Sequence, residues 1–177
     1  NLIQHVNVLG QDPTTTLYGI SLGGATPGSI ATGPNNDNKV INNSIKRAHI
    51  GVYSAGQVAT PNTGTEIREN ETSAVTGDRI RRVGIGLRND NGAQILDNSI
   101  NGINNTGESF DAIGIGVGTE DVNTTATTSG NVSNALVARN RVNGVSNDTT
   151  FSAAGIAVAG GTLGANTIVN NMVSGVI

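Results

Sequence analysis

The chain has 177 residues, a formal net charge of -3 and a sequence pI near 5.2, so it has no general electrostatic case for nucleic-acid binding. It has no cysteine, which excludes disulfides and thiolate metal sites, and its apolar runs are too short for a membrane span. Only 2% of its residues are aromatic, so a buried core must come from Ile, Val, Leu and Ala. This length predicts a single domain over residues 1–177.

The composition also indicates where such a chain works. Gly, Asn and Thr are abundant, whereas Lys occurs only at Lys39 and Lys46. The chain starts at Asn1 without a Met or a signal peptide, which favours a processed chain or a part of a longer one. This composition is typical of a secreted or surface-exposed bacterial protein, and we expect an extracellular or cell-surface location.

A short repeat runs along the chain, and its clearest copy begins at Val40. Each copy has an apolar residue, an Asn three positions later and a second apolar residue two positions after that. The copies are Val40-x-x-Asn43-x-Ile45, Val75-x-x-Asp78-x-Ile80, Ile95-x-x-Asn98-x-Ile100, Val137-x-x-Asn140-x-Val142 and Ile168-x-x-Asn171-x-Val173, after a degenerate copy at Ile3-x-x-Val6-x-Val8. Their spacing is irregular, and the shortest interval, from 75 to 95, is 20 residues.

A second apolar block, of the form Ile-x-Val, follows every copy except the last. The blocks are Gly19-Ile20-Ser21-Leu22, Ile50-Gly51-Val52, Gly84-Ile85-Gly86-Leu87, Gly114-Ile115-Gly116-Val117 and Gly155-Ile156-Ala157-Val158. Short, alternating, β-branched segments are typical of strands, and no helical period is sustained. Three short strands in about twenty residues make the smallest rung of a solenoid. We predict an all-β, right-handed parallel β-helix of about six rungs, with variable loop inserts.

The Asn of each repeat copy has a physical reason. A tight bend between strands needs a left-handed residue, which Asn tolerates, and amides stacked one rung apart can bond to one another. The predicted Asn ladder comprises Asn43, Asp78, Asn98, Asn140 and Asn171. The alternative for each position is an ordinary loop residue.

These repeats resemble those of the right-handed parallel β-helix superfamily with the pectate-lyase-like fold, over nearly the whole chain. The superfamily includes pectate lyases, polysaccharide epimerases, phage tailspikes and bacterial surface proteins. The resemblance implies the fold but no single activity, because the fold hosts lyases, hydrolases, adhesins and structural fibres. In its enzymes, loops beside the sheet that corresponds to Ile-x-Val wall a saccharide-binding groove, and the inserts here emerge beside that sheet.

The outer face expected for the Ile-x-Val sheet carries few functional groups. A lyase would need carboxylates for a cation and a base, and a hydrolase would need paired carboxylates. Neither set occurs there, so we expect no catalytic residue and favour a protein that is not an enzyme. A stripe of small residues instead permits packing by loops or a neighbouring subunit, or simply eases each strand into its bend. The predicted packing face comprises Gly51, Gly84, Gly86, Gly114, Gly116, Gly118, Gly155 and Ala157.

Basic residues cluster around the third strand of the rung and its turns: Lys46, Arg47, Arg79, Arg81, Arg82, Arg139 and Arg141. Such a cluster binds acidic glycans or an acidic partner, or else pairs with nearby acids such as Asp97, Glu66, Glu69 and Glu71. The residues selected for contact with a ligand or partner are Lys46, Arg47, His49, Tyr53, Arg81 and Arg88.

Metal and cofactor sites have little support in the sequence. Segments 35–37, 89–91 and 120–121 offer carboxylate and amide oxygens, but none has the spacing of a known calcium loop. We therefore expect no cofactor and no metal, with structural calcium as the alternative.

Neither end shows a polar cap, because Ile3 begins a rung at once and the segment 172–177 stops inside one. The chain is then either an excerpt of a longer β-helix or a unit that stacks end to end. We expect a structural or adhesive protein that associates with itself, as a filament or surface layer. The alternative is a carbohydrate-active module, a lyase or glycan-binding domain, that uses Arg88, His49, Tyr53 and the acids Glu120 and Asp121 beside the Ile-x-Val sheet.

Overall fold

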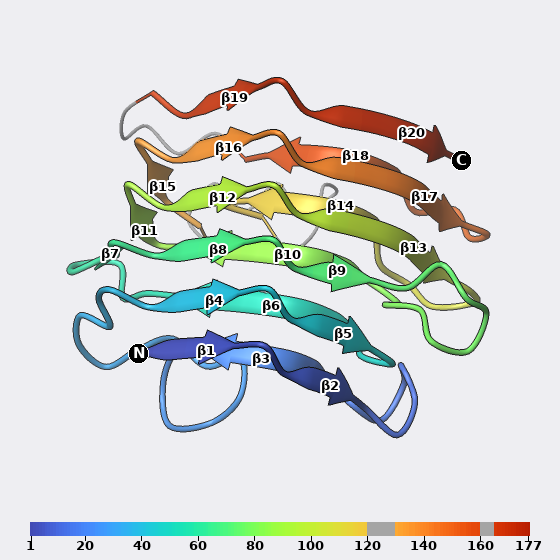
Figure 1. Cartoon of the computed structure of the whole chain (residues 1–177), viewed down its shortest axis with the longest axis horizontal. Helices are drawn as coiled ribbons and strands as arrows, with labels where there is room; N and C mark the ends of the chain where they lie inside the picture. Colours follow the sequence, from blue (N-terminus) through green and yellow to red (C-terminus); the bar gives the residue numbers. More distant parts are fainter. Residues whose placement is uncertain (120–129, 160–164) are drawn as a thin grey trace.

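The computed structural model consists of short strands in four parallel sheets, which the chain visits in turn (Figure 1). It describes residues 1–119, 130–159 and 165–177, and the statements that follow concern these residues. Within them there is no helix long and apolar enough to cross a membrane.

Two of the sheets have six strands each. Sheet A contains β1 (Leu2–Gln4), β4 (Lys39–Ile41), β8 (Glu66–Arg68), β12 (Gln94–Leu96), β16 (Leu136–Ala138) and β19 (Thr167–Val169). Sheet B contains β2 (Asn7–Leu9), β5 (Ser44–Lys46), β9 (Glu71–Thr72), β13 (Ser99–Asn105), β17 (Arg141–Asn147) and β20 (Met172–Val176).

The other two sheets are smaller. Sheet C contains β3 (Tyr18–Leu22), β6 (Ile50–Ala55), β10 (Val83–Arg88), β14 (Ala112–Val117) and β18 (Ala153–Val158). Sheet D contains β7 (Asn62–Thr63), β11 (Asp90–Asn91) and β15 (Val132–Ser133), and it adds a fourth sheet to the three strands per rung that the sequence predicts.

Each strand pairs in parallel with its counterpart one turn of the chain away, so equivalent residues form columns. In sheet A, Val40 pairs with Ile67, Ile67 with Ile95, and Ile95 with Val137. These four side chains are fully buried in the main apolar cluster. The prediction of an all-β chain with stacked parallel strands is confirmed, and the arrangement is compatible with a parallel β-helix.

One turn of the chain lies elsewhere than the repeat predicted. Its copy is Ile67-x-x-Asn70-x-Thr72, whereas Ile80 forms an isolated bridge with Ile103. Successive Asn residues of the repeat are separated by 27, 28, 42 and 31 residues, so the shortest interval is 27 and not 20. The sequence pattern missed this copy because Thr72 stands where the other copies have an apolar residue.

Between sheets A and B, stacked side chains form what we call the amide column: Asn43, Asn70, Asn98, Asn140 and Asn171. The Nδ2 of Asn98 donates to Oδ1 of Asn140 at 2.9 Å, and its own Oδ1 accepts from Nδ2 of Asn70 at 3.0 Å. Equivalent bonds join the other neighbours at 2.8 and 2.9 Å. Asp78 lies outside this column, and Asn70 takes the place that the sequence comparison gave to Asp78.

The residue with a left-handed conformation at this bend is the one before the Asn of the amide column. The prediction that the Asn itself has this conformation is wrong. Asn42, Glu69, Asp97, Arg139 and Asn170 have φ angles of 52°, 57°, 57°, 57° and 55°. Main-chain bonds to the next turn hold the first four of them there, as in the bond from Glu69 N to Leu96 O at 3.1 Å. Glu and Arg are therefore tolerated in a conformation that usually favours Asn or Gly.

Some of the glycines expected on the outer face of sheet C face the main core instead. A Cβ on Gly84 would lie 2.5 Å from Cγ2 of Ile100, and one on Gly114 would lie 2.4 Å from Cγ1 of Val142. Because Ile100 and Val142 belong to the main core, these glycines let sheet C approach sheet B. Gly84, Gly114 and Gly155 face sheet B, which corrects their assignment to an outer face, whereas Gly86 and Ala157 lie with a second apolar cluster away from the main core. All members of the predicted packing face are buried: Gly51, Gly84, Gly86, Gly114, Gly116, Gly118, Gly155 and Ala157.

A second apolar cluster lies on sheet C, apart from the main core; it contains Ile50, Tyr53, Ala55, Val83, Ile113 and Ala157. Gly86 lies against the Tyr53 ring, where a Cβ would be 3.0 Å from Cδ2. Tyr18 packs on the same ring with centroids 5.6 Å apart. The chain's own side chains therefore pack against the described part of this sheet.

Candidate functional site: the basic corner

Charged side chains gather where the chain passes from sheet B to sheet C, and we call this region the basic corner. Its members come from the short turn after β5, the loop between β9 and β10, and the loop between β13 and β14. They are Lys46, Arg47, His49, Asp78, Arg79, Arg81, Arg82, Glu108 and Phe110.

Main-chain hydrogen bonds fix the loop that carries the arginines. Arg47 N donates to Asp78 O at 3.1 Å and Arg81 N donates to Ala48 O at 3.0 Å. From the next turn, Asn104 N donates to Ile80 O at 3.0 Å. Segment 78–81 is therefore held between the turns on either side of it, and the parallel stack determines where its side chains begin.

Two acids neutralise part of this charge. Asp78 Oδ1 lies 2.8 Å from Arg47 Nε, and Asp78 Oδ2 lies 3.8 Å from Lys46 Nζ. Glu108 Oε1 lies 3.0 Å from Arg81 Nη2. Within residues 1–119, 130–159 and 165–177, neither Arg79 nor Arg82 has a carboxylate within ion-pair distance, so the corner keeps a positive excess.

Phe110 joins two of the basic side chains. Its ring centroid is 4.7 Å from that of His49, and the Arg82 guanidinium carbon lies 5.1 Å from the ring centroid, in cation–π contact. Burial lowers the pKa of His49; nearby Glu108 opposes this effect, and Arg82 and Arg81 add to it.

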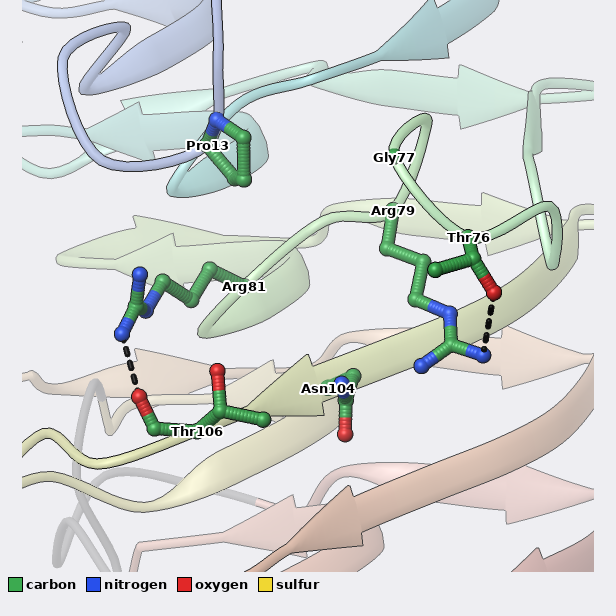
Figure 2. A pocket seen from close by; sticks show the side chains of 7 residues that line it. All are labelled: Pro13, Thr76, Gly77, Arg79, Arg81, Asn104 and Thr106. Atoms are coloured by element: carbon green, nitrogen blue, oxygen red, sulfur yellow. Dashed lines mark hydrogen bonds between the residues drawn. The ribbon is translucent and has the colours of Figure 1, made fainter.

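A hollow of about 110 Å³ opens at this corner (Figure 2). In the view of Figure 2, Asn104 lies between the side chains of Arg79 and Arg81, and Pro13 faces them from the loop after β2. Arg79 Nη2 donates to Thr76 Oγ1 at 3.3 Å, and Arg81 Nη2 donates to the main-chain oxygen of Thr106. The lining residues are Pro13, Thr76, Gly77, Arg79, Arg81, Asn104 and Thr106.

A second hollow, of about 270 Å³, lies beside sheets A and D. An ion pair borders it, with Lys39 Nζ 2.9 Å from Glu66 Oε2. The third charged residue of its lining is the acid Asp37, so this hollow offers less to an anionic ligand than the basic corner does.

The residues predicted from sequence to contact a ligand divide into two groups. Lys46, Arg47, His49 and Arg81 meet at the basic corner, with the first two paired to Asp78. Tyr53 and Arg88 lie farther along sheet C, and Tyr53 is only 1% exposed within the second apolar cluster. Glu120 and Asp121 lie outside the described residues.

Sequence reasoning did not select Thr106, Glu108 or Phe110. The feature of the sequence that could have indicated them is the insert at 103–111. It precedes an Ile-x-Val strand, as Arg79 to Arg82 precede the corresponding strand one turn earlier. Away from this corner, Arg139 pairs with Asp97 at 2.7 Å, as the alternative reading of the basic residues expected.

The chemistry available at the basic corner is that of donors. It combines the guanidinium groups of Arg79 and Arg81 and the amide of Asn104 around a small hollow. Over the described ranges, no three His, Cys, Asp or Glu residues are grouped so that they could hold a metal ion. Such a set suits the binding of an acceptor-rich anionic group better than the two-carboxylate chemistry of bond cleavage.

Comparison of the chain with family models, with curated proteins and with solved structures finds no match. The functional proposal therefore rests on the stacked sheets and on the basic corner.

Proposed function

We propose that this chain is a right-handed parallel β-helix of about six rungs with the pectate-lyase-like fold, and that it is a structural or adhesive element outside the cell. Right-handed crossovers are favoured because about 98% of parallel strand connections have that hand. The proposed role is to present a long, regular surface and to join further β-structure at its ends.

The observation that carries this proposal is the state of the last strands. In sheet B, Val142 is fully buried, whereas its column neighbour Val173 is 46% exposed. In sheet A, Val137 is fully buried, whereas Ile168 is 39% exposed. The strands β19 and β20 also have a sheet neighbour on one side only. The apolar side chains at this end are exposed, and the outer edges of β19 and β20 have unpaired main-chain groups. Both features favour pairing with a further strand.

The partner proposed for this edge is the opposite end of a second molecule. Such a head-to-tail contact would produce a filament, because it does not close on itself. At the other end the same columns begin with Ile3 and Val8, which are only partly buried, so both ends offer apolar contact.

Sedimentation velocity of residues 1–177 across micromolar concentrations tests self-association. We expect concentration-dependent growth in wild type and its loss in Val173→Lys, which places a charge in the joint. Val58→Lys is the matched control, because Val58 is a 54% exposed valine outside every strand. A monomer at all concentrations rules out the filament.

A second candidate is a carbohydrate-active module, and the hollow at the basic corner favours it. Incubation with polymers of uronic acid, with and without calcium, would test it through the unsaturated products of a lyase. If polymer binds without cleavage, the module is a binding domain; if it neither binds nor cleaves, the candidate is rejected.

A further inference from the structure

We propose that the hollow at the basic corner binds a single oxyanion group, a sulfate, phosphate or carboxylate, through the guanidinium of Arg79. The proposal concerns a site on the side of the stack and is independent of what covers the ends. It deepens the binding form of the second candidate, since an acidic polysaccharide is one carrier of such a group.

Charge balance singles out Arg79 among the residues that line the hollow. Arg81, the other cation there, is held by Glu108 at 3.0 Å. The neighbouring acid Asp78 is occupied by Arg47 and Lys46. Arg79 has no carboxylate within ion-pair distance among the described residues, so its charge is available to a ligand.

The hydrogen bonds of Arg79 lead to the same conclusion. A guanidinium carries five N–H donors in a fixed fork. The Arg79 bond to a described residue is a long one, 3.3 Å from Nη2 to the neutral Thr76 hydroxyl, and its buried Nε has no partner there. An oxyanion accepts two parallel bonds from such a fork, and these charge-assisted bonds are about twice as strong as neutral ones.

The opposite wall is preorganised. The Arg81 side chain is only 12% exposed, and its Nη2 bonds to both Glu108 and the Thr106 carbonyl. Asn104 is fixed as well, because its Oδ1 accepts from Ser146 Oγ at 2.6 Å. A ligand therefore finds a hollow whose shape requires little reordering, which reduces the entropy lost on binding.

Size limits the ligand. A volume of about 110 Å³ equals the liquid volume of roughly four water molecules. This space suits one acidic group and is too small for a chain of sugar rings, so a larger carrier must continue over the open surface.

Calorimetric titration of residues 1–177 with sodium sulfate, at constant ionic strength balanced by chloride, tests the site. We expect saturable one-to-one binding, equivalent binding of phosphate, and at least about tenfold weaker binding in Arg79→Gln, because a charge-assisted bond pair is lost. Arg141→Gln is the matched control: it removes an exposed arginine from β17, and its affinity should stay within about twofold of wild type. Equal weakening in both variants, or no saturation in wild type, overturns the proposal.

A second variant covers the case in which Arg79→Gln does not fold, as judged by circular dichroism. Arg79→Lys keeps the charge but loses the fork, so affinity should fall severalfold without vanishing. Unchanged affinity in Arg79→Lys overturns the role of the guanidinium. Competition with polygalacturonate or a sulfated dextran then identifies the carrier: displacement of sulfate shows a polymer-borne group, and no displacement shows that the site takes the free ion.

Discussion

The amide column and the basic corner are two bends of the same stack, and they differ in how each turn meets its neighbours. At the amide column every turn passes from sheet A to sheet B by a two-residue bend, and every bend after the first contains an Asn. At the basic corner the connection is short after β5 and much longer after β9 and β2. The first bend has the same length in every turn, whereas the length of the second differs from turn to turn.

The difference shows where chemistry can arise in a stacked fold. An Asn that faces another Asn satisfies its donors and acceptor within the column, so nothing remains for a ligand. At the basic corner each charge must find a partner in an unlike neighbouring turn. Arg47 finds Asp78, but Arg79 finds no acid in the described residues. Irregular turns leave the unpaired groups that a ligand needs.

The largest expected effect comes from breaking the amide column in its middle. Asn98→Ala removes a buried side chain that bonds Asn70, Asn140 and the Ile67 carbonyl. Since each buried group left unsatisfied costs about 1–3 kcal/mol, we expect about 4 kcal/mol lower free energy of unfolding in urea titrations. Asn7→Ala, at an exposed strand residue, is the control and should be nearly neutral. A loss below about 1 kcal/mol would show that the column contributes little.

The next largest effect is on the pH dependence of stability, and it comes from Asp90 at the start of β11 in sheet D. Asp90 is fully buried, with Oδ2 accepting from Thr65 Oγ1 at 2.6 Å, and burial raises its pKa to about 6. Between about pH 4 and 6 the folded chain holds this proton more tightly than the unfolded chain. Stability from this group therefore falls as pH rises through that window, by about 3 kcal/mol in total, and is flat above it.

Asp90→Asn removes that titration. Urea titrations of both proteins at pH 4, 5, 6 and 7 should show the stability of the variant gaining steadily on that of wild type as pH rises. Other carboxyl groups titrate equally in both proteins, so the difference isolates Asp90. Parallel curves would mean that Asp90 titrates in the folded chain as it does in the unfolded one.

Gly114→Ala tests the close approach of sheets B and C at the basic-corner side of sheet C. Its Cβ would meet Val142 and also the carbonyl oxygen of Gly155 at 2.5 Å, and main chain cannot yield easily. We expect a loss of about 2 kcal/mol, measured as a lower thermal midpoint. Gly33→Ala is the control, since a Cβ at Gly33 would meet nothing within 4 Å. Similar thermal midpoints for the two variants would contradict the close approach of Gly114 to sheet B.

The smallest effect belongs to the basic corner itself. Asp78→Asn breaks the contacts with Arg47 and Lys46, but all three side chains are partly exposed, so the loss should stay below about 1 kcal/mol and shrink in high salt. Asn70→Asp makes the opposite change of side chain in the amide column. It removes the Nδ2 donors of Asn70 and should lower the free energy of unfolding far more than Asp78→Asn does. If the two exchanges have equal effects in urea titrations, the contrast between the bends is wrong.

The regular part of this molecule was open to prediction, and the irregular part was not. Asn43, Asn98, Asn140 and Asn171 stand out in the sequence because the same environment recurs in every turn. Asn70 was missed because Thr72 broke the apolar pattern, and Gly84 and Gly114 were placed outside because strict alternation along the strand was assumed. The hollow depends on three loops of unequal length, 10–17, 73–82 and 106–111, and no local sequence pattern predicts how these loops lie relative to one another.

The amide column also gives the stack an electrical direction. In every bond the side-chain N–H of the earlier Asn points to the oxygen of the later one, so the amide dipoles add along the stacking axis. The partial positive end faces the C-terminal turns and the partial negative end faces the N-terminal turns. This is the reverse of an α-helix, whose N-terminus is the positive end.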